Sequence, residues 1–226
     1  GLLTTEEIDA LAERTLAHGG RVSYRNNPDG TQSPYELNIT LYDALNDPAH
    51  HDLEVDVLRF LASQAIMLAL AGLPGIYIHS LLGARNCGPC VEETGRARSI
   101  NREKFDLGEL ELQLADPSRR TRMVFDGYRR LLQVRCSQPA FHPEAPQEVL
   151  AVSPHVFALL RRPLEGAPVL CLTSVTNATV TLPLPAGMGL PTGDWRDLLH
   201  GHSCGDFAAG SPLVLGPYQT LWLTPA

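Results

Sequence analysis

Residues 53–86, LEVDVLRFLASQAIMLALAGLPGIYIHSLLGARN, carry the pattern that decides the fold. Up to Leu70, apolar side chains recur three and four positions apart, and alanines fill the positions of close contact. This period predicts a core-facing helix over residues 53–70. Gly72 ends the helix, and Pro74 prevents its continuation.

The next residues, 75–78, are apolar on both faces and include β-branched and aromatic side chains, which predicts a strand covered on both sides, as in a parallel sheet. A helix, a tight turn, a buried strand and a polar segment rich in glycine and arginine are typical of α/β barrels, whose functional side chains lie on the loops after the strands. We therefore expect a site in the segment after His79.

Composition limits the classes of function. The chain has 226 residues, which favours two folding units, and 44% of its residues are hydrophobic. Its 18 basic and 25 acidic side chains give a net charge of −7, so neither nucleic acid nor a membrane is an expected partner. No apolar stretch reaches the roughly 18 residues of a membrane-spanning helix. An acidic N-terminus unlike a signal peptide and only five scattered cysteines predict a cytoplasmic protein.

The segments before residue 53 are short. Thr4 or Thr5 can cap a helix with an apolar stripe made of Ile8, Leu11 and Leu16. We predict a short strand at residues 21–25 and a turn with proline and glycine at residues 26–30. An extended segment follows at residues 33–42.

A long connection, residues 81–117, follows the predicted parallel strand, and residues 118–135 return to a helix. Prolines concentrate after residue 139, where we place a domain boundary. The remaining predicted strands are short and separated by proline and glycine, as in a small antiparallel sheet or sandwich: residues 149–152, 156–160, 169–172, 180–184, 213–215 and 220–223.

Cys87-Gly88-Pro89-Cys90 is a CxxC motif, which can give two ligands to zinc or act as a redox dithiol. A zinc site needs four ligands, but no second CxxC follows, and the nearest downstream histidine is His142. The βαβ context of a thioredoxin-like motif is also missing. The sequence therefore favours neither metal nor redox use.

Three arginines gather at residues 96–102, RARSINR, with Arg98 and Arg102 on one face if the segment coils. Guanidinium groups make bidentate hydrogen bonds to carboxylates, phosphates and vicinal oxygens. The alternative is a solvated surface on which the arginines pair with neighbouring glutamates, namely Glu92, Glu93 and Glu103. Composition alone does not choose between the two.

Polar side chains of the extended segment, Tyr35, Glu36 and Asn38, could face a ligand, although the pattern by itself favours the polar face of a strand. His79 ends the predicted buried strand, where a structural histidine is the more common case. No GxSxG motif and no activated serine or cysteine indicates a nucleophile. No pair of carboxylates can be nominated for glycoside chemistry.

Four ordered motifs occur at residues 34–45, 68–86, 94–105 and 217–223: PYELNITLYDAL, LALAGLPGIYIHSLLGARN, TGRARSINREKF and PYQTLWL. Together they resemble the C-terminal part of the sucrose phosphorylase-like subfamily of glycoside hydrolase family 13, the α-amylase superfamily, over essentially the whole chain. The resemblance implies an α/β plus all-β fold. Residues 1–138 would be the C-terminal part of a (β/α)8 TIM barrel with a late inserted loop segment, and residues 139–226 a small antiparallel β-sheet domain.

The same resemblance implies that part of the active site is missing. In the superfamily, an Asp nucleophile, a Glu acid/base and a transition-state-stabilising Asp lie upstream of the matched region, and none has a counterpart in this sequence. A retaining mechanism needs two carboxylates about 5 Å apart. We therefore expect the chain to be a fragment with no catalytic residue of its own, inactive without the missing N-terminal barrel portion.

Substrate-binding roles are implied for several residues. Arg98 would hydrogen-bond hydroxyls of the glucosyl unit, although Ala97-Arg98-Ser99 replaces the more usual Gly-Arg-Asp. Tyr35 matches a mobile-loop tyrosine that contacts phosphate. Glu36 stands where sucrose phosphorylase has glutamine, which places an anion beside the incoming phosphate. Asn38 and His79 complete the predicted substrate-binding set.

Glu36 and the TGRARSINREK motif are most similar to the glucosylglycerate phosphorylase branch. The predicted function is transfer of a glucosyl unit from an α-glucoside to inorganic phosphate with retention, without a metal or organic cofactor. One alternative is a sucrose phosphorylase or a related amylase-type glucosyltransferase or hydrolase. The other is a non-catalytic carbohydrate-binding or structural module.

Overall fold

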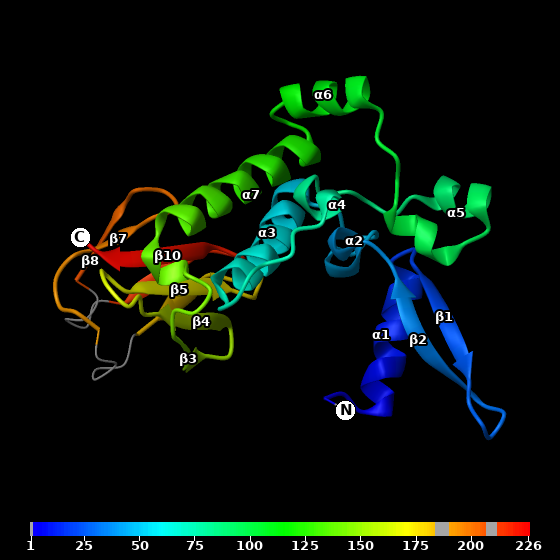
Figure 1. Ribbon diagram of the computed structural model, residues 1–226, viewed down its shortest axis with the longest axis horizontal. Coiled ribbons are helices and arrows are strands. Elements are labelled where there is room, and N and C mark those ends of the chain that lie inside the picture. The colour runs from blue at the N-terminus through cyan, green and yellow to red at the C-terminus, as the bar shows by residue number, and fades with distance from the viewer. Residues whose placement is uncertain (1, 184–189, 207–211) are drawn as a thin grey trace. The chain divides into compact units, whose positions relative to one another are not determined.

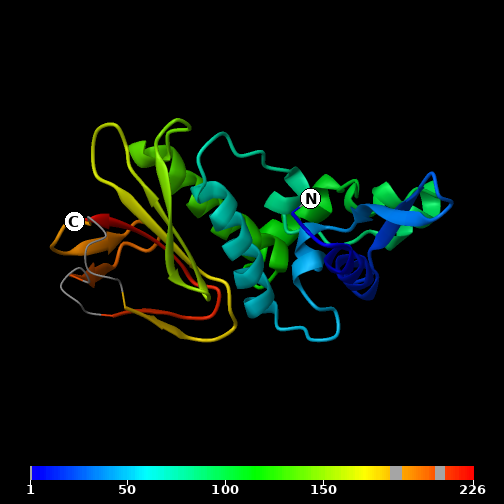
Figure 2. The same cartoon turned by 90° about the horizontal axis from the view of Figure 1, so that it is seen from below.

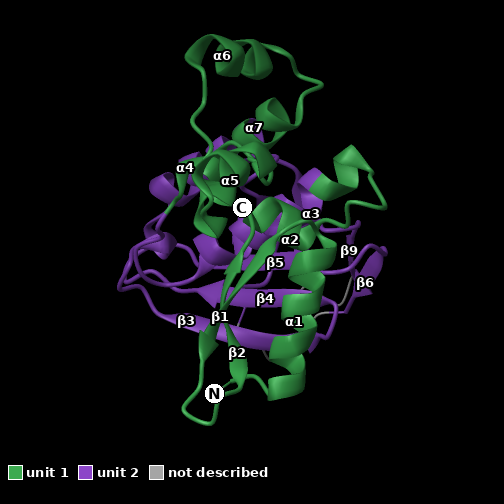
Figure 3. Ribbon diagram, turned by 90° about the vertical axis from the view of Figure 1, so that its right-hand side faces the viewer, with its two compact units in different colours: residues 1–56, 76–125 green, residues 57–75, 126–226 purple. Residues whose placement is uncertain are grey.

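The computed structural model describes residues 2–183, 190–206 and 212–226, which form two compact units (Figure 3). The first unit comprises residues 1–56 and 76–125, and the second comprises residues 57–75 and 126–226. Two helices, α3 (Leu53–Ala69) and α7 (Arg120–Ser137), contribute residues to both units. The helices predicted at residues 53–70 and 118–135 are thus confirmed, whereas the domain limits predicted at residues 138 and 139 stay a prediction.

Helix α1 (Thr5–Ala17) begins the first unit with a capping box. The Glu7 amide donates to Thr4 Oγ1 at 3.3 Å, and the Thr4 amide donates to Glu7 Oε2 at 2.8 Å. The predicted apolar stripe of this helix is wrong, because its three side chains are exposed and Ala12 and Thr15 are buried instead. Gly20 packs closely against this side of the helix, since a Cβ at position 20 would lie only 2.7 Å from Thr15 Cγ2.

Strands β1 (Arg21–Asn26) and β2 (Gln32–Asn38) form an antiparallel hairpin beside α1 (Figure 1). This confirms the predicted short strand, and the predicted turn also holds, with Gly30 at a φ of +83°. The predicted extended segment is confirmed only as far as Asn38. Beyond it, the Thr40 hydroxyl accepts the Asp43 amide at 3.3 Å and caps helix α2 (Leu41–Leu45).

The strand predicted at residues 75–78 is wrong. Residues 73–77 have no regular structure, and helix α4 (Ile78–Leu81) begins at the last predicted strand residue. A strand is stable only when its amide and carbonyl groups pair with a neighbour. Within the described residues of the first unit, β1 and β2 pair with each other and leave no parallel partner for this segment.

The connection predicted at residues 81–117 holds more structure than its sequence indicates. It contains helix α5 (Gly88–Thr94), the 3-10 helix η1 (Ala97–Asn101) and helix α6 (Leu107–Ala115). Gly95, at a φ of +64°, ends α5, and the Asp106 carboxylate accepts the Glu109 amide at 3.0 Å to start α6. These helices are too short to show a clear apolar period, and their end signals are single residues.

Six antiparallel strands form the main sheet of the second unit, in the order β3-β4-β5-β10-β7-β8. They are β3 (Gln147–Ser153), β4 (Val156–Arg161), β5 (Val169–Ser174), β7 (Trp195–Asp197), β8 (Ser203–Gly205) and β10 (Thr220–Pro225). Strands β6 (Val180–Leu182) and β9 (Leu213–Leu215) form a second, two-stranded sheet. All six predicted β segments are confirmed, with Leu184 outside the described residues. The unpredicted β7 and β8 have three residues each and, unlike β6 and β9, contain no β-branched residue.

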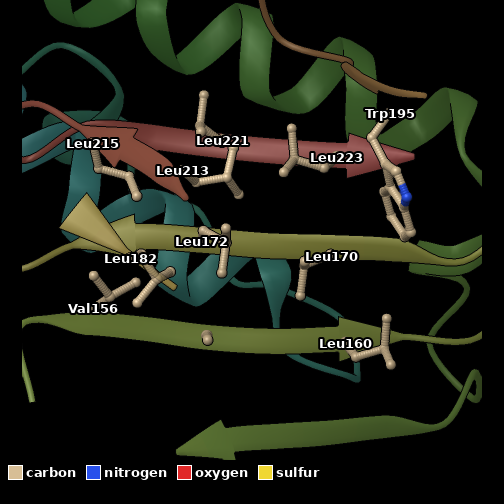
Figure 4. Close-up of a cluster of buried hydrophobic side chains, with 11 residues drawn as sticks. Val156, Leu160, Leu170, Leu172, Leu182, Trp195, Leu213, Leu215, Leu221 and Leu223 are labelled. Atoms are coloured by element: carbon tan, nitrogen blue, oxygen red, sulfur yellow. The ribbon is translucent and has the colours of Figure 1, made fainter. Parts of the chain in front are cut away.

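A hydrophobic core fills one face of the six-stranded sheet (Figure 4). Alternate residues of the central strands point into it, as the period of a strand requires, and β6 and β9 close it. Its fully or nearly buried members include Leu160, Leu170, Leu172, Leu182, Trp195, Leu215 and Leu223. Tryptophan is present only at positions 195 and 222, so both indole rings report on the second unit.

The opposite face of the sheet is also buried, next to α7 (Figure 2). The Trp222 ring lies 4.6 Å from that of Phe141, and the Arg161 side chain is completely buried. Arg161 donates to the carbonyl oxygens of Ala69, His142 and Ala145 at 2.8, 2.8 and 3.2 Å. Burial lowers the pKa of Arg161 because it removes water from the cation. Carbonyl dipoles at the end of α3 stabilise the positive charge of the guanidinium.

Among the helices of the described residues, none has the length and apolarity to cross a membrane.

Replacing Arg161 by methionine should destabilise the second unit by about 3 kcal/mol or more, because three buried carbonyl oxygens lose a charged donor. Urea unfolding followed by the fluorescence of the two tryptophans measures this. Arg162→Met is the matched control, since Arg162 is half-exposed and its contact with Glu148 is 3.9 Å long; it should cost less than about 1 kcal/mol. Equal effects of the two substitutions would contradict the role given to Arg161.

Candidate functional site

A cleft of about 730 Å³ lies within the first unit, between the β1–β2 hairpin and residues 94–102, called here the arginine segment. The hairpin contributes Ser23, Tyr35 and Glu36 to the lining. The arginine segment contributes Thr94, Arg96, Ala97, Arg98, Ser99 and Arg102. Two motifs about 60 residues apart in sequence therefore meet in one cleft, and three of the five predicted site residues line it.

Arg98 and Glu36 form an ion pair in the lining of this cleft. Arg98 Nε donates to Glu36 Oε2 at 2.9 Å, while the two side chains remain 56% and 34% exposed. The hydrogen bond that Arg98 donates to the Glu36 carboxylate raises the pKa of Arg98 above its ordinary value. Both side chains are within reach of a ligand, and Glu36 occupies a guanidinium that a ligand oxygen could also bind.

The other two arginines of the cleft are not neutralised. Within the described part of the chain, Arg96 and Arg102 have no ion pair, and the alternative pairing of the arginines with Glu92, Glu93 and Glu103 is not formed. Three guanidiniums face one carboxylate, so the cleft carries a net positive charge. Such a lining suits an anion such as phosphate or a carboxylate, together with a hydroxyl-rich body.

Asn38 lies behind the cleft rather than in its lining. Only 3% of Asn38 is exposed, and its side-chain amide donates to Ser23 Oγ at 2.9 Å. Ser23 stands opposite Glu36 in the hairpin, beside a β-bulge between Ser23 and Tyr24. Asn38 therefore holds Ser23 in position. Ser23 was not predicted, because a β-bulge that the sequence does not indicate places it opposite Glu36.

His79 is also outside the lining. Its Nε2 lies 2.9 Å from the Glu103 carbonyl oxygen, and its ring stacks on Tyr77 at 4.7 Å and contacts Phe105 at 5.0 Å. Because a carbonyl only accepts, Nε2 carries the proton of this bond. His79 thus fixes the chain that follows the arginine segment, and it has no contact with the cleft.

A buried carboxylate, Asp43, links the hairpin to the start of α5 and was not predicted. Asp43 is 3% exposed and accepts Arg85 Nε at 2.7 Å and the Asn86 amide at 2.6 Å. The Asn86 side chain in turn accepts the Thr40 amide at 2.9 Å. The loop before Cys87 is therefore attached to the segment that follows β2.

Cys87 and Cys90 form a disulfide next to the arginine segment. Among the residues that the structure describes, no group of three or more His, Cys, Asp or Glu side chains could hold a metal ion.

The second unit has a separate cavity of about 540 Å³ between α3, α7 and residues 216–220, and none of the predicted site residues lies in it.

Comparison with known sequences gives close relatives. No family model matches the chain. A glucosylglycerate phosphorylase of Allomeiothermus silvanus is 42% identical over 224 residues, which is 99% of this chain and 37% of that protein. A glucosylglycerate phosphorylase of Escherichia coli is 34% identical over 223 residues, or 99% and 38% of the two chains. The chain thus spans little more than a third of the length of these curated relatives.

Solved structures show the same fold. The chain superposes on a sucrose 6F-phosphate phosphorylase of Thermoanaerobacter thermosaccharolyticum with a TM-score of 0.64 and 21% identity, over 81% of this chain and 35% of that one. It matches AmyP in complex with maltose with a TM-score of 0.65 and 16% identity, over 81% and 37%. Both confirm the predicted fold class, the C-terminal part of a (β/α)8 enzyme with a small antiparallel β domain. Over nearly its whole length the chain is thus a homologue of glucosylglycerate phosphorylases and matches little more than a third of such a protein, which fits a C-terminal portion of the sucrose phosphorylase-like subfamily of glycoside hydrolase family 13.

Proposed function

We propose that the chain is part of a retaining α-glucoside phosphorylase, and that its cleft binds the phosphate and the anionic end of an α-glucosylglycerate donor. The single observation that carries this proposal is the meeting of Tyr35 and Glu36 with Arg98 in one cleft of net positive charge. The relatives named glucosylglycerate phosphorylase favour glycerate over fructose as the leaving group.

Charge supports the same choice of substrate. In phosphorolysis with retention, the leaving group departs from the glucosyl unit and phosphate then takes its place. With glucosylglycerate both groups are anions, so Arg96 and Arg102 can serve each in turn without a change in the cleft. With sucrose the leaving group is neutral. The guanidiniums would then have no counter-ion while the leaving group occupies the cleft, and would gain one only when phosphate replaces it.

The chain's own residues would bind and orient, and the bond-breaking carboxylates would come from the rest of the barrel, as the resemblance implies. Arg98 would hold hydroxyls of the glucosyl unit, Tyr35 would donate its hydroxyl to phosphate, and Glu36 would limit how tightly phosphate binds. Asn38 and His79 act in this proposal as positioning residues. We place the enzyme in the cytoplasm, with a glucoside and inorganic phosphate as its partners and no metal or organic cofactor.

Two other functions compete with this one. A sucrose phosphorylase or related amylase-type glucosyltransferase or hydrolase would use the same Arg98 contact with another acceptor, since sucrose phosphorylases are also among the relatives. A non-catalytic carbohydrate-binding module would bind sugar through the cleft without turnover. Initial rates of glucose 1-phosphate formation and of glucose release, measured with the full-length enzyme on glucosylglycerate and on sucrose, separate the three. The proposed enzyme forms glucose 1-phosphate from glucosylglycerate, the first alternative acts on sucrose or releases glucose, and the binding module does neither.

Arg98→Ala in the full-length enzyme should lower kcat/KM for the glucosyl donor about 10- to 150-fold, because a charged hydrogen bond worth roughly 1.5–3 kcal/mol is lost. The matched control is Arg119→Ala, which removes an exposed arginine that pairs with Asp116 outside the cleft. The control should stay within about twofold of the parent enzyme. If Arg98→Ala behaves like the control, Arg98 has no role in binding.

Tyr35→Phe should raise the KM for phosphate about five- to tenfold and leave the KM for the glucosyl donor unchanged, since only one neutral hydrogen bond is removed. Tyr24→Phe is the matched control, because Tyr24 is an exposed tyrosine of the same hairpin outside the cleft lining. Kinetics with donor and phosphate varied independently give both constants. If Tyr35→Phe changes only the KM for the glucosyl donor, the Tyr35 hydroxyl does not contact phosphate.

Glu36→Gln should lower the KM for phosphate about fivefold. The expected gain corresponds to the roughly 1 kcal/mol of repulsion between two unit charges about 4 Å apart in water. Glu93→Gln, a change of the same kind on the exposed side of α5, should have no effect. Weaker phosphate binding in Glu36→Gln would mean that Glu36 organises Arg98 for phosphate instead of repelling it.

A further inference from the structure

We propose that Cys87 and Cys90 are a reversible thiol–disulfide exchange site, and that its reduction loosens the arginine segment of the cleft. The two Cα atoms are 5.3 Å apart, within the usual range for a disulfide. Both residues are half-buried, so a small or protein reductant can reach them. The sequence alone favours no redox role for this pair; contacts seen only in the structure connect it to the cleft.

Neither of the two common structural roles for paired cysteines fits this pair. A disulfide between residues three apart closes a very short loop and restricts the unfolded chain little, so it contributes little to global stability. No metal-holding group forms around it within the described residues. In the reducing cytoplasm, where we place the enzyme under the proposed function, disulfides are mostly transient and redox-active.

Hydrogen bonds connect the pair directly to the arginine segment. The Cys87 amide donates to the Ile100 carbonyl oxygen at 2.8 Å. The Thr94 hydroxyl lies 2.7 Å from both the Cys90 carbonyl oxygen and the Ser99 hydroxyl. Since a carbonyl only accepts, Thr94 gives its one proton to Cys90 and receives the proton of Ser99.

The pair also stands between a fixed and a less constrained part of the chain. Immediately before it, the Asn86 amide donates to the buried Asp43 carboxylate at 2.6 Å. Immediately after α5, the arginine segment is mostly exposed and is held by the bonds of Cys87 and Thr94 and by the Arg98–Glu36 pair. Once the S–S bond is broken, the two side chains rotate independently, and the first turn of α5 no longer transmits the fixed position of Asn86 to Arg98.

The exchange reaction needs a dithiol as reductant. One thiolate of the dithiol attacks a sulfur of the Cys87–Cys90 bond, which breaks and leaves a mixed disulfide and one free protein thiol. The second thiolate of the reductant then attacks the reductant sulfur that is bonded to the protein in the mixed disulfide, and this releases the second protein thiol. The protein leaves with two thiols, having gained two electrons and two protons, and the reductant leaves as a cyclic disulfide.

Hydrogen–deuterium exchange of the chain, untreated and after full reduction with dithiothreitol, tests the proposal. We expect at least tenfold faster exchange in the reduced form for the amides of Cys87, Ser99 and Arg102, which donate to Ile100, Arg96 and Ser99. Amides of β4 and β5 should not change. The double variant Cys87→Ser/Cys90→Ser should exchange like the reduced form without reductant.

The control variant is Cys136→Ser, which removes an exposed free thiol of the second unit and should match the parent chain in both states. Unchanged exchange after mass spectrometry has shown complete reduction would overturn the proposal. So would alkylation of both cysteines in the untreated chain. If the double variant does not fold, the comparison of exchange rates between the untreated and the reduced parent chain still tests the proposal. The redox site rests on the proposed phosphorylase function, since it acts on the cleft of that enzyme. Amide exchange is measured without any activity, so the redox proposal and the phosphorylase proposal can fail separately.

Discussion

The carboxylate of Asp43 accepts hydrogen bonds from Arg85 and the Asn86 amide in the interior of the first unit, where only 3% of the residue is exposed. A buried carboxylate is tolerated only when it is paired and hydrogen-bonded. This requirement fixes the loop after α4 against the segment after β2. Tyr35 and Glu36 lie just before that junction and the arginine segment lies just after it, so the cleft depends on this contact.

In the second unit a buried cation has the corresponding role. Arg161 extends from β4 to carbonyl oxygens at the end of α3 and in residues 142–145. Arg135 adds bonds to the carbonyl oxygens of Leu68 and Gly72. A guanidinium presents several donors in fixed directions and can therefore satisfy a helix end, a loop and a strand together. The sheet of the β domain is joined to the last turn of α3 in this way.

The cleft itself combines a stable frame with exposed binding groups. Asn38 and His79 bond to Ser23 and to the Glu103 carbonyl oxygen, and so support the two walls without facing the ligand space. Arg98 and Glu36 remain exposed and exchangeable, because an ion pair in water is weak enough for a ligand anion to replace one partner. Buried polar contacts thus hold the walls of the cleft, and its partly exposed charged groups are available to a ligand.

Periodicity, caps and motifs in the sequence determined most of the secondary structure. The helix at residues 53–70, the capped N-terminal helix, the hairpin strands and six strands of the β domain follow from local pattern, because side-chain period and end signals act over a few residues. The family motifs likewise pointed to Tyr35, Glu36 and Arg98, which share the cleft.

Tertiary structure decided the rest. Residues 75–78 have the composition of a buried strand but no partner to pair with, and hydrogen-bond pairing is a property of the neighbours and not of the segment. The exposed side of α1, the placing of Asn38 and His79 behind the cleft, and the pairing of Arg98 with Glu36 instead of a nearby glutamate all depend on contacts between residues far apart in sequence. No local pattern encodes those distances, because they are set by how the segments pack.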